Sequence, residues 1–181
     1  MRVVVAMTEL LASFEANAKE AAAFVGRVGA SAASVREAVQ RAAGSAGKIV
    51  LGPEEFLPKE TMGALRDLPG VILQPSDEQL STAEVGVSAA FAGIASSGSV
   101  CIAMGAPLAS AASLLMPLHI VLLSPERIVR RPRDLFDPQS LGGEGLRRDL
   151  VLITGPSATA DMGPLVRGVH GPHRLQIFVL G

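Results

Sequence analysis

The sequence predicts an α/β fold of three layers, α/β/α, in which helices cover both faces of a mainly parallel sheet. Segments with helical spacing alternate with short apolar segments through the first half of the chain. The later apolar segments lack polar alternation, which is typical of strands buried on both faces. Hydrophobic residues make up 49% of the 181 residues, enough for a full core. We therefore expect one domain over residues 1–181.

The first elements follow from spacing and from helix-capping residues. Residues 8–25 place apolar side chains on one face at helical spacing and predict the first helix. Residues 1–7 are either an edge strand or an upstream extension. Ser34 and Glu37 have the spacing of a capping box, which predicts a second helix that stops at Gly44.

The remaining elements continue the alternation. Residues 57–68, with a proline in the first turn, predict a third helix, and the capping pair of Ser76 and Gln79 opens a short fourth one. Residues 109–115 and 134–146 predict helical turns. Short apolar runs predict strands at residues 48–51, 71–73, 86–91, 93–95, 99–103, 119–123, 127–129, 149–153 and 174–180.

Composition excludes several classes of protein. The net charge of −1 gives no basic excess for nucleic acid, and 3% aromatic residues give no platform for stacking bases. No apolar run reaches the ~20 residues of a membrane span. The single Cys101 cannot form an internal disulfide, which fits a reducing, cytoplasmic compartment, and it cannot hold an iron–sulfur cluster by itself. We therefore expect no cofactor in this chain.

A serine-rich turn before residues 99–103 is the first candidate site. Ser97, Gly98 and Ser99 offer hydroxyl and amide donors that can surround an anion or a carboxylate. The alternative is a tight β-turn between two strands, because serine and glycine are ordinary turn residues.

The second candidate site is the polar, glycine-rich segment at residues 155–172, between the last two strands. Gly155 turns the chain, and Ser157, Thr159 and Asp161 follow at alternate positions. Hydroxyls and amides at a helical turn favour an anion, and Asp161 either caps the turn or binds a ligand hydroxyl. A capped turn without a ligand is the alternative.

Three further residues carry chemistry. Arg167 suits a carboxylate or phosphate, because its guanidinium makes bidentate contacts. His170 lies between small residues as a candidate proton carrier, and His119 precedes a buried strand. For each histidine the alternative is a structural role, which is the more common one for a lone histidine. The three histidines of the chain lack the spacing of a zinc site, and the sequence contains no phosphate-binding glycine motif and no serine-hydrolase elbow.

The tail segment resembles the C-terminal signature of the LUD domain, the domain of the lactate-utilisation protein C family. The matching residues read TGPSATAD followed by LVRGVHGP. Residues 87–99, 113–120 and 127–129 resemble further family segments in the same order, so that the resemblance covers about residues 8–181. It implies a fold similar to that of ribose-5-phosphate isomerases, glucosamine-6-phosphate isomerases and CoA transferases. It also implies a role in oxidising L-lactate to pyruvate with partner proteins that carry iron–sulfur clusters.

Two departures from the family pattern bear on catalysis. Ser96 stands where the family has an acidic residue, and Ser110 or a neighbouring alanine stands where it has a basic one. A carboxylate in such a loop acts as general base or nucleophile, and a serine without a base cannot replace it. We therefore expect an accessory or ligand-binding subunit, not an enzyme in its own right. The alternatives are an independent isomerase- or transferase-like enzyme for a small phosphorylated or carboxylated substrate, and a non-catalytic sensing or assembly module.

Overall fold

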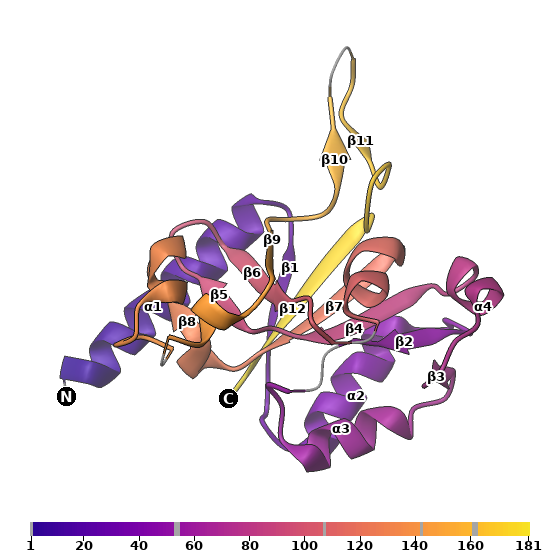
Figure 1. Cartoon of the computed structure of the whole chain (residues 1–181), viewed down its shortest axis with the longest axis horizontal. Coiled ribbons are helices and arrows are strands. Elements are labelled where there is room, and N and C mark those ends of the chain that lie inside the picture. Colours follow the sequence, from indigo (N-terminus) through magenta and orange to yellow (C-terminus); the bar gives the residue numbers. More distant parts are fainter. Residues whose placement is uncertain (1, 53–54, 107, 142, 161–162) are drawn as a thin grey trace.

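A six-stranded parallel sheet forms the centre of the molecule (Figure 1). The computed structural model describes residues 2–52, 55–106, 108–141, 143–160 and 163–181. The strand order is β1-β12-β7-β4-β2-β3, and every adjacent pair is parallel. This arrangement confirms the predicted α/β class. The strands are β1 (Phe24–Val28), β2 (Ile49–Leu51), β3 (Val71–Ile72), β4 (Val85–Ala89), β7 (Leu118–Leu123) and β12 (Arg174–Leu180).

Helices cover both faces of this sheet, and successive residues of β7 show which helix covers which face. Ile120 belongs to a core cluster with Val39 of α2 and Leu65 of α3. Val121 belongs to a second cluster with Phe14 of α1. Because successive strand residues point to opposite faces, α1 lies on the face opposite α2 and α3. The helices are α1 (Arg2–Glu20), α2 (Ala32–Ala43), α3 (Lys59–Arg66) and α4 (Asp77–Ser81).

A second sheet of four strands lies on the same side of the central sheet as α1. Its order is β8-β5-β6-β9, with β5 and β8 parallel and the other pairs antiparallel. The sequence does not show that these strands form a sheet of their own, because a short apolar run carries no information about the sheet it joins. The strands are β5 (Ala92–Ile94), β6 (Ser99–Ala103), β8 (Ile128–Val129) and β9 (Leu150–Ile153).

The N-terminal segment differs from its prediction. An edge strand over residues 1–7 is wrong, because α1 begins at Arg2. The same helix stops at Glu20, and residues 24–28 form β1 instead of a last helical turn. Pairing with β12 over five residues decides this conformation, and that partner lies about 150 positions away.

The capping predictions were nearly all correct. Ser76 and Gln79 form the expected reciprocal capping box of α4. Gly44 ends α2 with a φ of 62°. The start of α2 lies three residues earlier than predicted, since Ser31 is the N-cap and its Oγ accepts a hydrogen bond from the amide of Ser34 at 3.2 Å.

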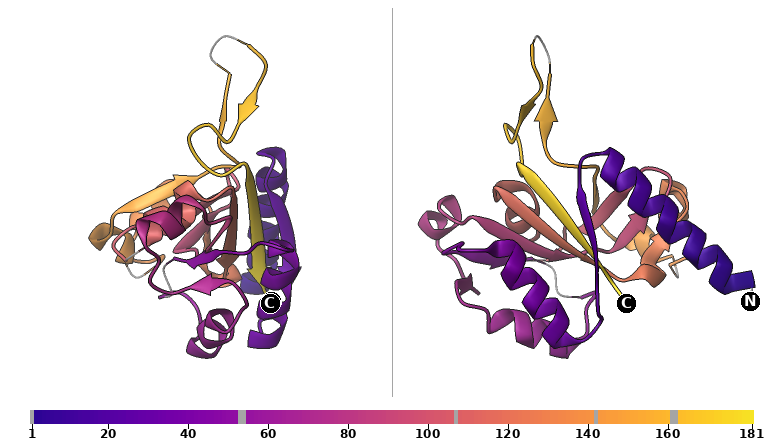
Figure 2. Two further views of the ribbon diagram at one scale, coloured as in Figure 1. Left: turned by 90° about the vertical axis from the view of Figure 1, so that its right-hand side faces the viewer. Right: turned by 180° about the vertical axis from the view of Figure 1, so that it is seen from behind.

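The excursions around the sheets contain short helical turns and a protruding hairpin. A π-helical turn covers Ala111–Leu115, and 3-10 turns cover Pro125–Arg127, Pro132–Phe136 and Glu144–Arg147. Strands β10 (Ala158–Thr159) and β11 (Val166–Arg167) pair antiparallel within residues 155–172, here named the tail hairpin. The tail hairpin stands away from the body in every view (Figure 2). No helix in the described part of the chain is long and apolar enough to cross a membrane.

Candidate functional site

The serine turn between β5 and β6 is joined to the start of the tail by a chain of hydroxyl groups. The Oγ atoms of Ser97 and Ser99 are 2.7 Å apart, and Ser99 Oγ lies 2.6 Å from Thr154 Oγ1. Ser99 is buried. The Asn17 side chain of α1 donates to the carbonyl of Ala95 at 2.7 Å. These side chains are therefore hydrogen-bonded within the protein, and the turn has a structural role in packing against α1.

The two predicted site glycines, Gly98 and Gly155, both lie against α1. Gly155 has a φ of 72°, and a side chain there would place its Cβ 2.0 Å from the carbonyl oxygen of Ala21. Gly98 meets the backbone of the same helix. The close approach of α1 therefore explains both glycines without a ligand.

The tail hairpin does not bring its polar residues to one point. Ser157 donates its amide to the carbonyl of Pro172 at 2.9 Å and accepts from the amide of Gly168 at 2.9 Å. Arg167 pairs with Ala158, and Thr159 with Val166. Thr159 and Arg167 therefore point to opposite faces of the hairpin. Asp161 lies outside the described residues.

His170 lies at the base of the tail hairpin and is exposed. It lines a hollow of about 320 Å³ together with Leu114 and Leu115 of the π-helical turn. Large apolar side chains are exposed on the same hairpin. Leu165, Val166 and Val169 have exposed fractions of 58%, 52% and 51%. This surface is more apolar than a solvated loop requires.

His119 lies in the core, in β7, with no exposed surface. Its Nε2 is 3.2 Å from Ser88 Oγ, while its Nδ1 has no hydrogen-bond partner among the described residues. Burial lowers the pKa of His119 to about 3. The imidazole is therefore neutral at physiological pH, and it is held apart from the serine turn and from the tail hairpin.

Ser96 and Ser110, the two departures from the family pattern, are both exposed. Ser96 lines a hollow between α1 and the second sheet. Ser110 precedes the π-helical turn, and its Oγ lies 4.0 Å from the sulfur of Met104. Neither hydroxyl has a general base as hydrogen-bond partner among the described residues.

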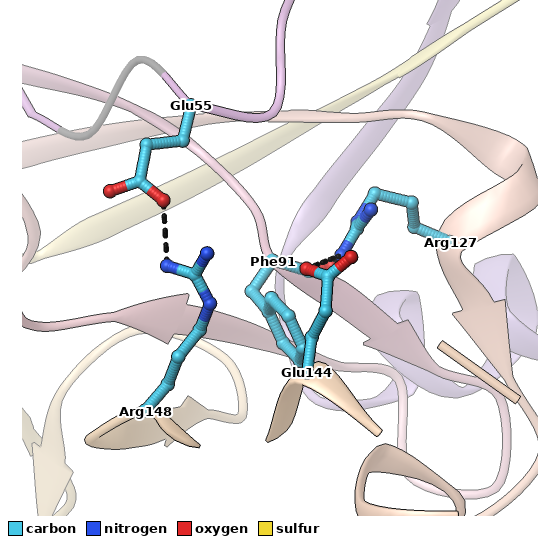
Figure 3. Close-up of polar contacts among 5 residues, drawn as sticks. All are labelled: Glu55, Phe91, Arg127, Glu144 and Arg148. Atoms are coloured by element: carbon cyan, nitrogen blue, oxygen red, sulfur yellow. Dashed lines mark hydrogen bonds and ion pairs between the residues drawn. The ribbon is translucent and has the colours of Figure 1, made fainter. Parts of the chain in front are cut away.

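A cluster that was not predicted from the sequence lies beyond the carboxyl ends of β4 and β7. Figure 3 shows its polar contacts. The guanidinium of Arg127 stacks on the rings of Phe56 and Phe91, 4.7 and 4.9 Å from their centroids. Its Nε donates to the carbonyl of Phe91, and a terminal nitrogen lies 3.5 Å from Glu144 Oε2.

Arg148 completes this arginine–phenylalanine cluster. One of its terminal nitrogens donates to Glu55 Oε2 at 2.6 Å (Figure 3). Its guanidinium lies 5.1 Å from the centroid of the Phe56 ring. Segments that follow β2, β4 and β7 meet here, where open α/β sheets bind ligands. Arg148 is hydrogen-bonded to Glu55, whereas Arg127 lies within ion-pair distance of Glu144 and its buried Nη2 has no hydrogen-bond partner among the described residues. The cluster holds residues 144–148 onto the end of the sheet.

We predict that Arg127→Ala lowers the free energy of unfolding by about 2 kcal/mol, because stacking on two rings and a charge-assisted hydrogen bond are lost together. Urea unfolding measures the change. Arg133→Ala is the matched control, since Arg133 is 76% exposed and its variant should differ by less than about 0.5 kcal/mol. Equal effects of the two substitutions would show that the stacking contributes nothing.

The parallel sheet, the α1-side sheet and the tail hairpin between the last two strands define the class: an α/β protein with an added hairpin. The LUD domain family matches residues 73–180, which include the serine turn and the tail hairpin. The chain is 31% identical over 156 residues to Lactate utilization protein C of Deinococcus radiodurans, a match that covers 83% of this chain and 71% of that protein. The chain belongs to the LUD domain family, which confirms the resemblance.

Two further matches agree with this assignment. An uncharacterised protein of Neisseria meningitidis serogroup B is 29% identical over 104 residues, which cover 57% of this chain and 45% of that protein. The crystal structure of a DUF162 family protein from Deinococcus radiodurans is 22% identical and superposes with a TM-score of 0.69 over 97% of this chain and 98% of that one. This structure confirms the fold.

Proposed function

We propose that this chain is an accessory subunit in lactate utilisation, working in the cytoplasm with iron–sulfur proteins that carry out the oxidation of L-lactate to pyruvate. The observation that carries the proposal is 31% identity to Lactate utilization protein C across 83% of the chain. The matched region includes the tail segment by which the sequence resembles the family.

The lone cysteine supports a redox centre in the partner proteins. Cys101 lies in β6 without exposed surface, and burial raises the pKa of its thiol to about 12. Only a thiolate ligates iron or attacks a substrate, and this thiol stays protonated. Two electrons leave L-lactate on its oxidation to pyruvate, so an acceptor held by another protein completes the reaction.

The tail hairpin supports an assembly role. Contiguous exposed apolar residues on a protruding element are typical of protein interaction surfaces. Leu165 and Val169 are both more than half exposed. We propose that this surface contacts the iron–sulfur partners.

Growth on L-lactate tests the proposal. Deleting the gene should abolish growth on L-lactate and spare growth on glucose, and the wild-type gene should restore it. The double variant Leu165→Asp/Val169→Asp should keep the wild-type melting temperature, because both side chains are exposed, yet fail to restore growth and fail to co-purify with iron-containing proteins.

The matched control is Cys101→Ala, which should restore growth because the thiol has no role in electron transfer. A deletion strain that grows normally on L-lactate would refute the lactate role. A folded Cys101→Ala protein that cannot restore growth would refute the placement of the redox centre in the partners.

A further inference from the structure

A hollow of about 250 Å³ lies between α1 and the carboxyl ends of two parallel strands of the second sheet. Ile94 of β5 and Val129 of β8 are register partners, and the amide of Ser96 donates to the carbonyl of Arg130 at 3.0 Å. Ser96 and Arg130 thus follow the ends of adjacent parallel strands.

Two exposed arginines line this hollow and supply its positive charge. Neither guanidinium forms an ion pair with a carboxylate in the described part of the chain, in contrast to Arg127 and Arg148. One acidic residue, Glu9, also lines the hollow, which leaves its charge at +1. The complete lining is Glu9, Leu10, Ser13, Ala95, Ser96, Arg130 and Arg131.

We propose that this hollow binds a small oxyanion, a carboxylate or a phosphate. Arg130 and Arg131 supply several N–H donors in the planar geometry that suits both groups. The exposed hydroxyl of Ser96 adds a donor, whereas Ser13 Oγ already donates weakly to Ala95 O at 3.4 Å. The volume lies just below the ~300 Å³ at which pockets for drug-sized ligands begin, so the ligand is a few heavy atoms across.

Binding at this hollow follows from its charge and shape and does not depend on the lactate role. If the anion is L-lactate, the hollow is the ligand site of the proposed accessory subunit. If the anion is phosphate, the hollow serves a separate, regulatory or sensing purpose. Because the same arginines can bind either anion, the two cases are distinguished by measuring the binding of each anion separately.

Calorimetric titration of the purified full chain with L-lactate and, separately, with inorganic phosphate tests the proposal. We expect saturable binding of at least one of them at one site per chain. Arg130→Gln/Arg131→Gln should weaken that binding by about tenfold or abolish it. Glu9→Gln should tighten anion binding by roughly twofold to threefold, because it removes a negative charge that repels the anion.

The opposite signs of these two changes separate a binding role from general damage to the fold. Arg41→Gln is the matched control, since Arg41 lies on α2 across the central sheet and should leave binding unchanged. The proposal is overturned if the wild type binds neither anion, if the double arginine variant binds as well as the wild type, or if Glu9→Gln binds more weakly. A gene that supports growth on L-lactate while its product binds neither anion would refute this site and leave the lactate role intact.

Discussion

Gly98→Ala should lower the free energy of unfolding by about 3 kcal/mol or more, a large effect for a single methyl group. Gly98 has a φ of 65°, a left-handed conformation that costs alanine about 1–2 kcal/mol. Its Cβ would also lie 2.0 Å from the amide nitrogen of Ala18 and 2.4 Å from the Cα of that residue. These are backbone atoms of α1, and the helix must shift as a whole to make room.

Gly143→Ala is the matched control for this substitution. Gly143 has nearly the same φ, 70°, with a ψ of 12° in the left-handed region, and a Cβ built there comes no closer than 3.6 Å to another atom. The control should therefore lose only the conformational cost of about 1–2 kcal/mol. Urea unfolding of the two variants and the wild type isolates the steric part as the difference between them. Equal losses would contradict the close packing of the serine turn on α1.

The comparison bears on what the small residues of the serine turn do. From the sequence, Ser97, Gly98 and Ser99 fit a tight turn better than an anion site. In the structure, the hydroxyl of Ser99 is hydrogen-bonded to those of Ser97 and Thr154. Gly98 packs closely against the backbone of α1. A large steric cost at Gly98 supports the packed turn and directs the search for a ligand to Ser96, on the outer side of the same turn.

The sequence predicted the helix ends that depend on interactions between residues close together in the chain. Ser76 and Gln79 cap α4 through bonds between near neighbours, and Gly44 ends α2 by its own φ. Strand β1 was missed, because Val25 continues the apolar spacing of α1 and only pairing with β12 makes its segment a strand. The second sheet was missed for the same reason, since its order depends on partners such as Val100 and Ile153, which are 53 residues apart.

Long-range contacts limited the site prediction in the same way. The arginine–phenylalanine cluster joins Glu55, Phe91, Arg127 and Arg148 from four separate segments, and no spacing along the chain connects them. The tail residues were recognisable by their order and identified the family. Their geometry was not predictable, because β10 and β11 have two residues each and such short strands carry no periodicity.

His119 should make the stability of the protein fall on mild acidification. Its pKa is about 3 in the folded state, where burial disfavours the imidazolium, against about 6.5 in an unfolded chain. Between these values the unfolded state binds the proton more strongly. Stability is therefore fully present above pH 6.5 and is lost as the pH falls toward 3. From pH 7.5 to pH 5 this single group should lower the free energy of unfolding by about 2 kcal/mol.

Urea unfolding at several pH values between 7.5 and 5 measures this effect, in a range above most carboxylate titrations. His119→Gln removes the titrating group and should flatten the profile, whatever the substitution does to stability at pH 7.5. His170→Gln is the matched control, because it makes the same substitution at an exposed histidine. A His119→Gln profile as steep as that of the wild type would show that His119 does not cause the pH dependence. The slope thus decides whether His119 is a neutral partner of Ser88 or a charged group.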